Sequence, residues 1–133
     1  MADLSITASS VTTDDATFTG LAGEALTAGQ AVYQDPDDQL WYLSDANATD
    51  KRQVEAIALA SVAAGQVVPL VGDGALLVLN SVLTVATLYC LSPTPGGIAP
   101  YADVTSASNR FSIGYGETAT GLRLDFKDLG LVP

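Results

Sequence analysis

The run Asp35-Pro36-Asp37-Asp38 is the densest group of potential metal ligands in the sequence. Calcium loops of the helix–loop–helix type need oxygen ligands at positions 1, 3 and 5, Gly at 6 and Glu at 12. Counted from Asp35, positions 5, 6 and 12 hold Gln39, Leu40 and Ala46, so the pattern fails after two ligands. We therefore expect a solvated turn, with a weak calcium site as the alternative, and we expect no metal and no cofactor.

Nucleophilic and zinc chemistry lack their usual residues. The chain has no histidine and one cysteine, Cys90, which stands in an apolar stretch, so zinc sites and Ser-His-Asp or Cys-His devices are excluded. Gly72-Asp73-Gly74 and Gly114-Tyr115-Gly116 lack the spacing of phosphate-binding loops. A pair of carboxylates for glycoside hydrolysis stays open, but the acids stand mainly in turns, where no apolar surroundings raise a pKa. We expect that the protein is not an enzyme.

Three aromatic residues, Tyr33, Trp41 and Tyr42, are close together in the sequence. Strand alternation puts Leu40 and Tyr42 on one face and Trp41 and Leu43 on the other. One of these faces must be covered by something besides the core of the domain. We favour core plus a subunit interface, and the alternative is a sugar platform with Trp41 exposed.

The pattern of short apolar segments and Gly- or Pro-bearing turns predicts an all-β fold. Strands are expected over residues 31–34, 40–43, 55–60, 66–71, 75–79, 87–91, 98–100, 110–115 and 121–126. One short helix is expected over 44–53, with Ser44 or Asp45 as N-cap. About ten short strands at this spacing are typical of a β-barrel or sandwich, so we predict a single compact domain over residues 18–133.

An internal echo at a spacing of 56 residues suggests two similar halves, about 20–76 and 77–128. The matching pairs are Tyr33 with Tyr89, Ile57 with Ile113, Ala63 with Ala119, Gly65 with Gly121 and Leu70 with Phe126. The echo predicts one β-unit used twice, each half closing the core of the other. Because the matches are few and mostly small residues, chance is the alternative.

Residues 1–17 differ from the rest, with seven Ser or Thr, three Asp and no base. They carry too little apolar surface to fold alone, so we predict an extended N-terminal arm, free or laid on a neighbouring subunit. Strand addition would place Leu4 and Ile6 in apolar pockets, and Asp14 and Asp15 would meet basic groups. A tail without a role is the alternative.

Charge is unevenly distributed in a chain with a net charge of −10. Residues 1–50 hold nine acids and no base, whereas residues 51–133 hold six acids and five bases. This surface would repel nucleic acid and anionic membranes, and no apolar run approaches the ~20 residues of a membrane span. The acidity serves either solubility or docking on a basic partner. The first residues lack the features of a secretory signal, so we expect the chain to be used where it is made.

Several segments resemble small head-decoration (cement) proteins of tailed bacteriophages. The segments are Gly23-Glu24-Ala25-Leu26-Thr27-Ala28-Gly29-Gln30-Ala31-Val32-Tyr33, the acidic turn that follows, Tyr42-Leu43-Ser44-Asp45-Ala46, Ala56-Ile57-Ala58-Leu59-Ala60, Ala63-Ala64-Gly65-Gln66-Val67-Val68, Leu88-Tyr89-Cys90-Leu91-Ser92-Pro93 and Leu122-Arg123-Leu124-Asp125-Phe126. The similarity of pattern covers residues 20–126. The chain departs from it at Ala58 and Ala86, where such proteins commonly carry Gly.

This resemblance implies a β-barrel-like domain that forms homotrimers on the capsid exterior and has no enzymatic activity. The expected partners are the major capsid protein and the chain itself, with no nucleic acid and no membrane. The expected location is the capsid exterior of the virion, after synthesis in the host cytoplasm. The alternative is a carbohydrate- or host-surface-binding β-module of a phage head fibre or tail, and a small glycosidase comes third. The residues themselves, not the resemblance, suggest the partner-binding positions Leu4, Ile6, Asp14, Asp15, Trp41 and Tyr42.

Overall fold

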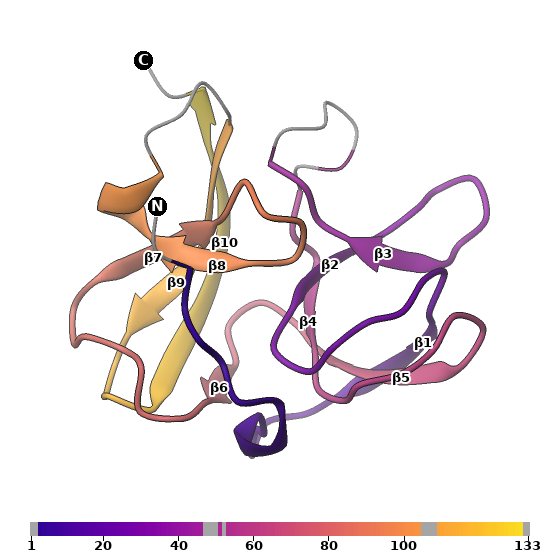
Figure 1. Ribbon diagram of the computed structural model, residues 1–133, viewed down its shortest axis with the longest axis horizontal. Helices are drawn as coiled ribbons and strands as arrows, with labels where there is room; N and C mark the ends of the chain where they lie inside the picture. Colours follow the sequence, from indigo (N-terminus) through magenta and orange to yellow (C-terminus); the bar gives the residue numbers. More distant parts are fainter. Residues whose placement is uncertain (1–2, 47–50, 52, 105–108, 132–133) are drawn as a thin grey trace.

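The computed structural model describes residues 3–46, 51, 53–104 and 109–131, and it contains two five-stranded antiparallel sheets (Figure 1). The first sheet is formed by β1 (Phe18–Leu21), β2 (Ala31–Gln34), β3 (Trp41–Leu43), β4 (Ala56–Ala58) and β5 (Val67–Val71). The second is formed by β6 (Leu76–Val78), β7 (Leu88–Leu91), β8 (Ile98–Pro100), β9 (Asn109–Gly116) and β10 (Gly121–Leu131). The predicted all-β, sandwich-like fold is confirmed.

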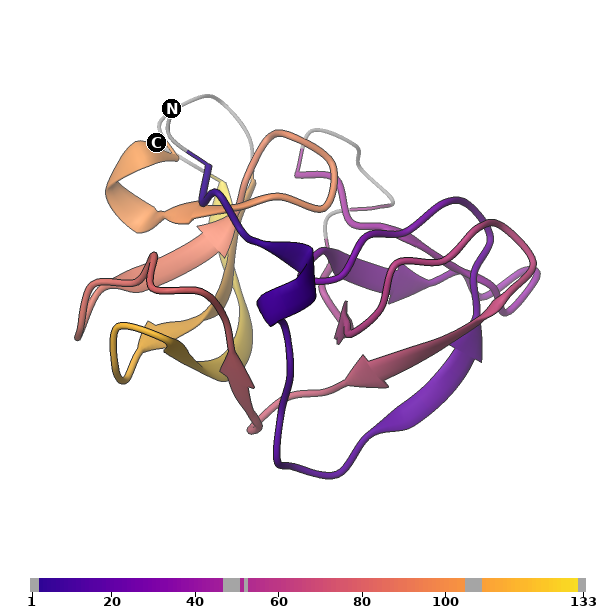
Figure 2. The same cartoon turned by 60° about the horizontal axis from the view of Figure 1, so that its bottom comes forward.

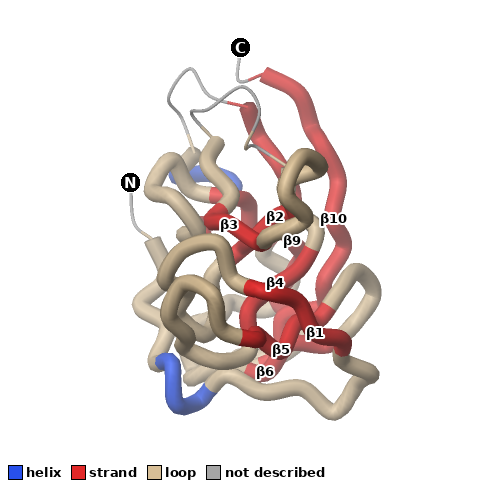
Figure 3. Tube along the Cα trace, turned by 90° about the vertical axis from the view of Figure 1, so that its right-hand side faces the viewer, coloured by secondary structure: helices blue, strands red, loops and turns tan. Residues whose placement is uncertain are grey.

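Helical structure in the described residues is limited to two 3-10 turns, η1 (Ala8–Ser10) and η2 (Tyr101–Asp103), which the sequence did not predict (Figure 3). The helix predicted over 44–53 falls partly outside the described residues, and the described ones among them are not helical. The hydroxyl of Ser44, the expected N-cap, donates instead to the carbonyl of Gln53 at 2.7 Å. It therefore holds the two ends of a loop together.

The two sheets repeat one order of strands. The first runs β1-β5-β4-β2-β3 and the second β6-β10-β9-β7-β8, so β1 to β5 correspond to β6 to β10 in turn. Tyr33 and Tyr89 are both buried in corresponding strands, as are Ile57 and Ile113. The correspondence is not residue for residue, because β9 and β10 have 8 and 11 residues against 3 and 5 in β4 and β5.

Gly65 lies in the turn between β4 and β5, and Gly121 follows the corresponding turn between β9 and β10. Gly65 has a φ of +85°, which glycine adopts without the steric cost that a side chain adds. Gly121 opens β10, and a Cβ there would lie 2.9 Å from Oγ1 of Thr118. The two glycines are thus required for different reasons.

The largest hydrophobic cluster, called here the main core, contains residues of both sheets. Its buried members include Ala31, Ile57, Val71, Leu77, Tyr89, Leu91, Ile98, Ile113, Leu122 and Leu124. Because side chains alternate along a strand, Val71 faces the main core while Leu70 faces away from it. Each half therefore contributes one apolar face to a core that the other half completes.

The opposite face of the first sheet surrounds a second cluster, called here the Trp41 core. Its buried members are Ala22, Leu26, Val32, Trp41, Ala56, Ala58, Val68 and Leu70. Ala22 forms a parallel bridge to Trp41, and the amide of Gly23 donates to the carbonyl of Trp41 at 2.8 Å. Because β1 and β3 are the outer strands of this sheet, the bridge brings its two edges together at one point.

The N-terminal segment, which the sequence predicted to be an arm, free or laid on a neighbour, lies along its own domain in this structure. The amide of Leu4 donates to the carbonyl of Ile98 in β8 at 2.8 Å, and Thr12 pairs with Val78 in β6. Since β6 and β8 are the outer strands of the second sheet, the segment joins its two edges. Figures 1 and 2 show this segment in indigo, passing across the molecule before it reaches β1.

Candidate partner-binding surfaces

The carboxylates of the acidic turn between β2 and β3 accept hydrogen bonds from groups of the same hairpin. Asp35 accepts a hydrogen bond from the amide of Asp37 at 2.8 Å, and Asp38 accepts one from the amide of Leu40 at 2.9 Å. The second oxygen of Asp38 accepts the hydroxyl of Tyr42 at 2.6 Å. These bonds fix a tight turn of the kind that Asp and Pro favour.

The hydrogen bond between Tyr42 and Asp38 shifts the titration of both groups. It lowers the pKa of Asp38 below its usual value, with a further contribution from the amide of Leu40. It raises the pKa of Tyr42 to about 12, because a nearby carboxylate favours the protonated phenol. Tyr42 is half-buried, so part of its side chain is exposed to solvent.

Trp41 is part of the core and not of an open platform. Its exposed fraction is 6%, and the ring of Phe18 lies 5.9 Å away between centroids. Gly20 provides the space for the indole, since a Cβ at that position would lie 2.3 Å from Nε1. The exposed Trp41 that a sugar platform would need is not seen.

Leu4 and Ile6 line a groove of about 200 Å³ between the N-terminal segment and two loops, 27–30 and 94–98. Both are half-buried and pack against the main core. Gly29, at a φ of +92°, leaves room for Ile6, because a Cβ there would lie 2.8 Å from Cγ2 of the isoleucine. The apolar pockets expected on a partner are thus supplied by the chain itself.

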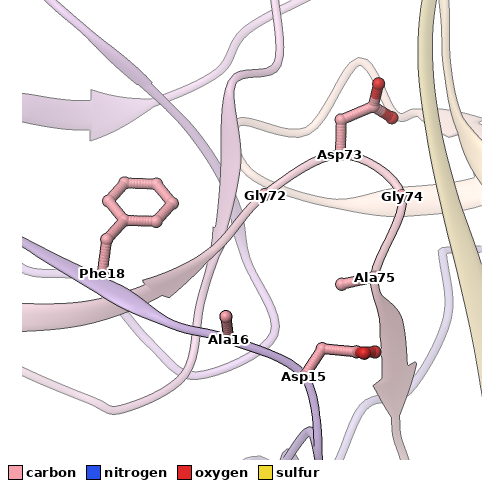
Figure 4. A pocket seen from close by; sticks show the side chains of 7 residues that line it. All are labelled: Asp15, Ala16, Phe18, Gly72, Asp73, Gly74 and Ala75. Carbon is pink, nitrogen blue, oxygen red and sulfur yellow. The ribbon is translucent and has the colours of Figure 1, made fainter.

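Asp15 lies at a second, open groove of about 440 Å³, which is also lined by Phe18 and by residues 72–75 (Figure 4). One oxygen of Asp15 accepts the amide of Leu76 at 2.8 Å. The carboxylate of Asp73, also on this groove, accepts the amide of Phe126 at 2.8 Å. Both carboxylates bind backbone, so they fasten segments together instead of presenting two bare charges to a ligand.

The six residues predicted to contact partners are not gathered in one place. Leu4 and Ile6 share one groove, Asp15 lies at another, Tyr42 is on the hairpin and Trp41 is buried. Asp14 is exposed beside Asp15.

Sequence reasoning missed two exposed apolar residues, Leu21 at 48% and Val67 at 60% exposed. They lie directly opposite each other on β1 and β5. A signal was present in the sequence, because residues 16–23 and 56–72 contain no charged side chain.

Among residues 3–46, 51, 53–104 and 109–131, no three His, Cys, Asp or Glu side chains are placed to hold a metal ion. Cys90 is fully buried. None of the described helices has the length and apolar character needed to span a membrane. No family model matches the sequence, and no curated protein matches it.

Proposed function

We propose that this chain is a structural protein of a phage virion that binds the outside of the capsid as a trimer and stabilises the contacts between major capsid subunits. The proposal rests on the resemblance over residues 20–126 to head-decoration proteins, and it assigns no catalytic activity. The compact all-β domain is compatible with it, because such a domain offers rigid surfaces for binding at modest size.

The observation that carries the proposal is the uneven distribution of charge. Nine acids and no base occur in residues 1–50. Both ion pairs found among the described residues, Arg123–Glu117 and Lys127–Asp125, lie in the second half. With nine acids and no base, residues 1–50 carry a negative charge that attracts a basic surface, and oppositely charged surfaces steer association.

Direct attachment to capsids tests the proposal. Capsids of the encoding phage, prepared without this protein, would be mixed with it and sedimented, and their resistance to thermal disruption would be measured. We expect saturable binding and capsids that open at a higher temperature. Lack of binding to both expanded and unexpanded capsids would rule out a decoration role.

The burial of Trp41 does not favour a carbohydrate-binding module. That alternative depended on Trp41 being exposed in a groove, and Trp41 is buried against Phe18 and Gly20. A glycan-hydrolysis assay distinguishes the third alternative, a small glycosidase, from both binding roles.

A further inference from the structure

The face of the first sheet that carries the main core extends beyond the part that the second sheet covers. In β5, Val71 belongs to the main core, and alternation places Pro69 and Val67 on the same face. Pro69 is half-buried and Val67 is 60% exposed, so the side chains on this face of β5 become more exposed from Val71 toward Val67. Leu21, 48% exposed, stands opposite Val67 on this face.

This uncovered part, called here the β1–β5 face, consists of Thr19, Leu21, Val67 and Pro69. Thr19 pairs with Pro69, so the four residues form two adjacent cross-strand pairs. β1 is the outer strand of its sheet, and both pairs therefore lie at an edge. Exposed apolar residues at a sheet edge are typical of a surface that another chain covers.

The β1–β5 face is also uncharged in a strongly acidic protein. Residues 16–23 and 56–72 contain no charged side chain, although the chain has a net charge of −10. A basic partner is attracted to carboxylates, and none of the four residues of this face carries one. Two copies of this chain repel each other, and they approach at lowest electrostatic cost through surfaces without charge.

We infer that the β1–β5 face is the surface through which this chain associates with a second copy of itself. The inference deepens the proposed function, because it rests on the trimer proposed there and assigns one of the contacts of that trimer. Burial of Leu21 and Val67 against the neighbour supplies the apolar part of the interface.

Sedimentation equilibrium over a wide concentration range tests this inference with two variants of equal charge. Val67→Lys places an ammonium group in the β1–β5 face, and Val85→Lys is the control, because Val85 is also 60% exposed but lies in the second half. Each substitution makes the net charge less negative, which by itself favours association. We expect self-association at least about tenfold weaker for Val67→Lys and unchanged for Val85→Lys, since a lysine must be desolvated in an apolar interface.

Leu21→Lys repeats the test at the opposing position, and circular dichroism with thermal unfolding verifies that each variant is folded. A wild-type chain that is monomeric at every concentration, or folded Val67→Lys and Leu21→Lys variants that associate like wild type, would overturn the inference. Equal weakening by Val85→Lys would overturn it as well. Capsid binding is measured separately: if the β1–β5 variants lose self-association but wild type binds no capsid, the decoration role fails and this interface stands.

Discussion

Ala86 is held in a left-handed backbone conformation, with a φ of +66°, that alanine rarely adopts. Its amide donates to the carbonyl of Gly116 at 2.7 Å, which fixes the turn that precedes β7. Proteins of the decoration type commonly carry Gly where Ala86 stands, and the backbone conformation gives a physical reason for that preference. The sequence alone showed that Ala86 stands where such proteins carry Gly, but it did not show that the backbone conformation there is unfavourable for alanine.

We predict that Ala86→Gly stabilises the protein by roughly 0.5–1 kcal/mol, because the gain from relieving the left-handed alanine exceeds the larger backbone entropy of glycine in the unfolded chain. Ala119→Gly is the control. Ala119 is also exposed in a turn but has no positive φ, so glycine there lowers stability by a similar amount. Urea unfolding measures the change in the free energy of unfolding for both variants. A loss of stability in Ala86→Gly would contradict the prediction.

Tyr42 provides a test of the acidic hairpin by titration. Spectrophotometric titration of wild type, after subtraction of the Tyr42→Phe variant, is expected to show a phenol with a midpoint of about 12. In Asp38→Asn the midpoint returns toward 10, because the carboxylate that favours the protonated phenol is lost. An unchanged midpoint in Asp38→Asn would show that the hydrogen bond does not form in solution.

The same pair makes the stability of the hairpin depend on pH at both ends of the scale. The pKa of Asp38 is lower in the folded state than its ordinary 3.8, so its contribution is complete above that value and is lost as the pH falls through the folded pKa. The pKa of Tyr42 is higher in the folded state, so its contribution is complete below 10 and is lost as the pH rises through about 12.

At the scale of elements, the N-terminal segment is part of the fold. Ile6 packs against the main core and Val11 is buried, so removing their side chains exposes apolar surface of the domain. We predict that Ile6→Ala lowers the free energy of unfolding by about 1–2 kcal/mol, less than for a fully buried isoleucine. Thr12→Ala is the control, because Thr12 is exposed and its bridge to Val78 uses only backbone atoms.

Thermal unfolding of these two variants measures the difference. Equal midpoints for Ile6→Ala and wild type would mean that the segment does not stay on its domain in solution. In that case the arrangement expected from the sequence, an arm laid on another subunit, would again be the better description.

Most strands could be predicted from the sequence because their signals are local. Alternation and a strong turn at Asp35–Asp38 define the hairpin of β2 and β3, and Trp41 and Leu43 share one face as expected. The helix over 44–53 was wrong in its described part, since the Ser44 hydroxyl binds the carbonyl of Gln53 across a loop. Local sequence does not show such a closure.

The position of the N-terminal segment could not be predicted, because its partners are distant in the sequence. The side chain of Asn80 accepts the amide of Thr7 at 2.8 Å and donates to the carbonyl of Ser5 at 3.0 Å. The alternation of Leu4 and Ile6 correctly indicated an extended segment with one apolar side. It could not distinguish its own domain from a neighbour, since alternation along a strand does not identify what the strand packs against.

For the molecule as a whole, added salt is expected to act in opposite directions on the two proposed contacts, which are attachment to capsids and self-association. We predict that added salt weakens attachment to capsids, because it screens attraction between the acidic first half and a basic surface. The same salt strengthens self-association, because the β1–β5 face is uncharged and screening reduces only the repulsion between copies with a net charge of −10. Capsid co-sedimentation and sedimentation equilibrium across one salt series measure both slopes.

If capsid attachment is insensitive to salt, the acidity serves solubility alone, which was the other interpretation of the composition. If self-association weakens with salt, charged groups contribute to the interface and its location on the β1–β5 face is wrong.

The strand order has a consequence for how the chain folds as it is synthesised. In each half the first strand pairs with the last, β1 with β5 and β6 with β10. All strands of the first sheet exist once Val71 has left the ribosome, but its main-core face is not fully covered until β6 to β10 have followed. The N-terminal segment also cannot take its final position until β6 and β8 are made, because it forms hydrogen bonds with Val78 and Ile98. Leu4 and Ile6 thus reach their final place late, and until then their side chains lack the cover of the main core.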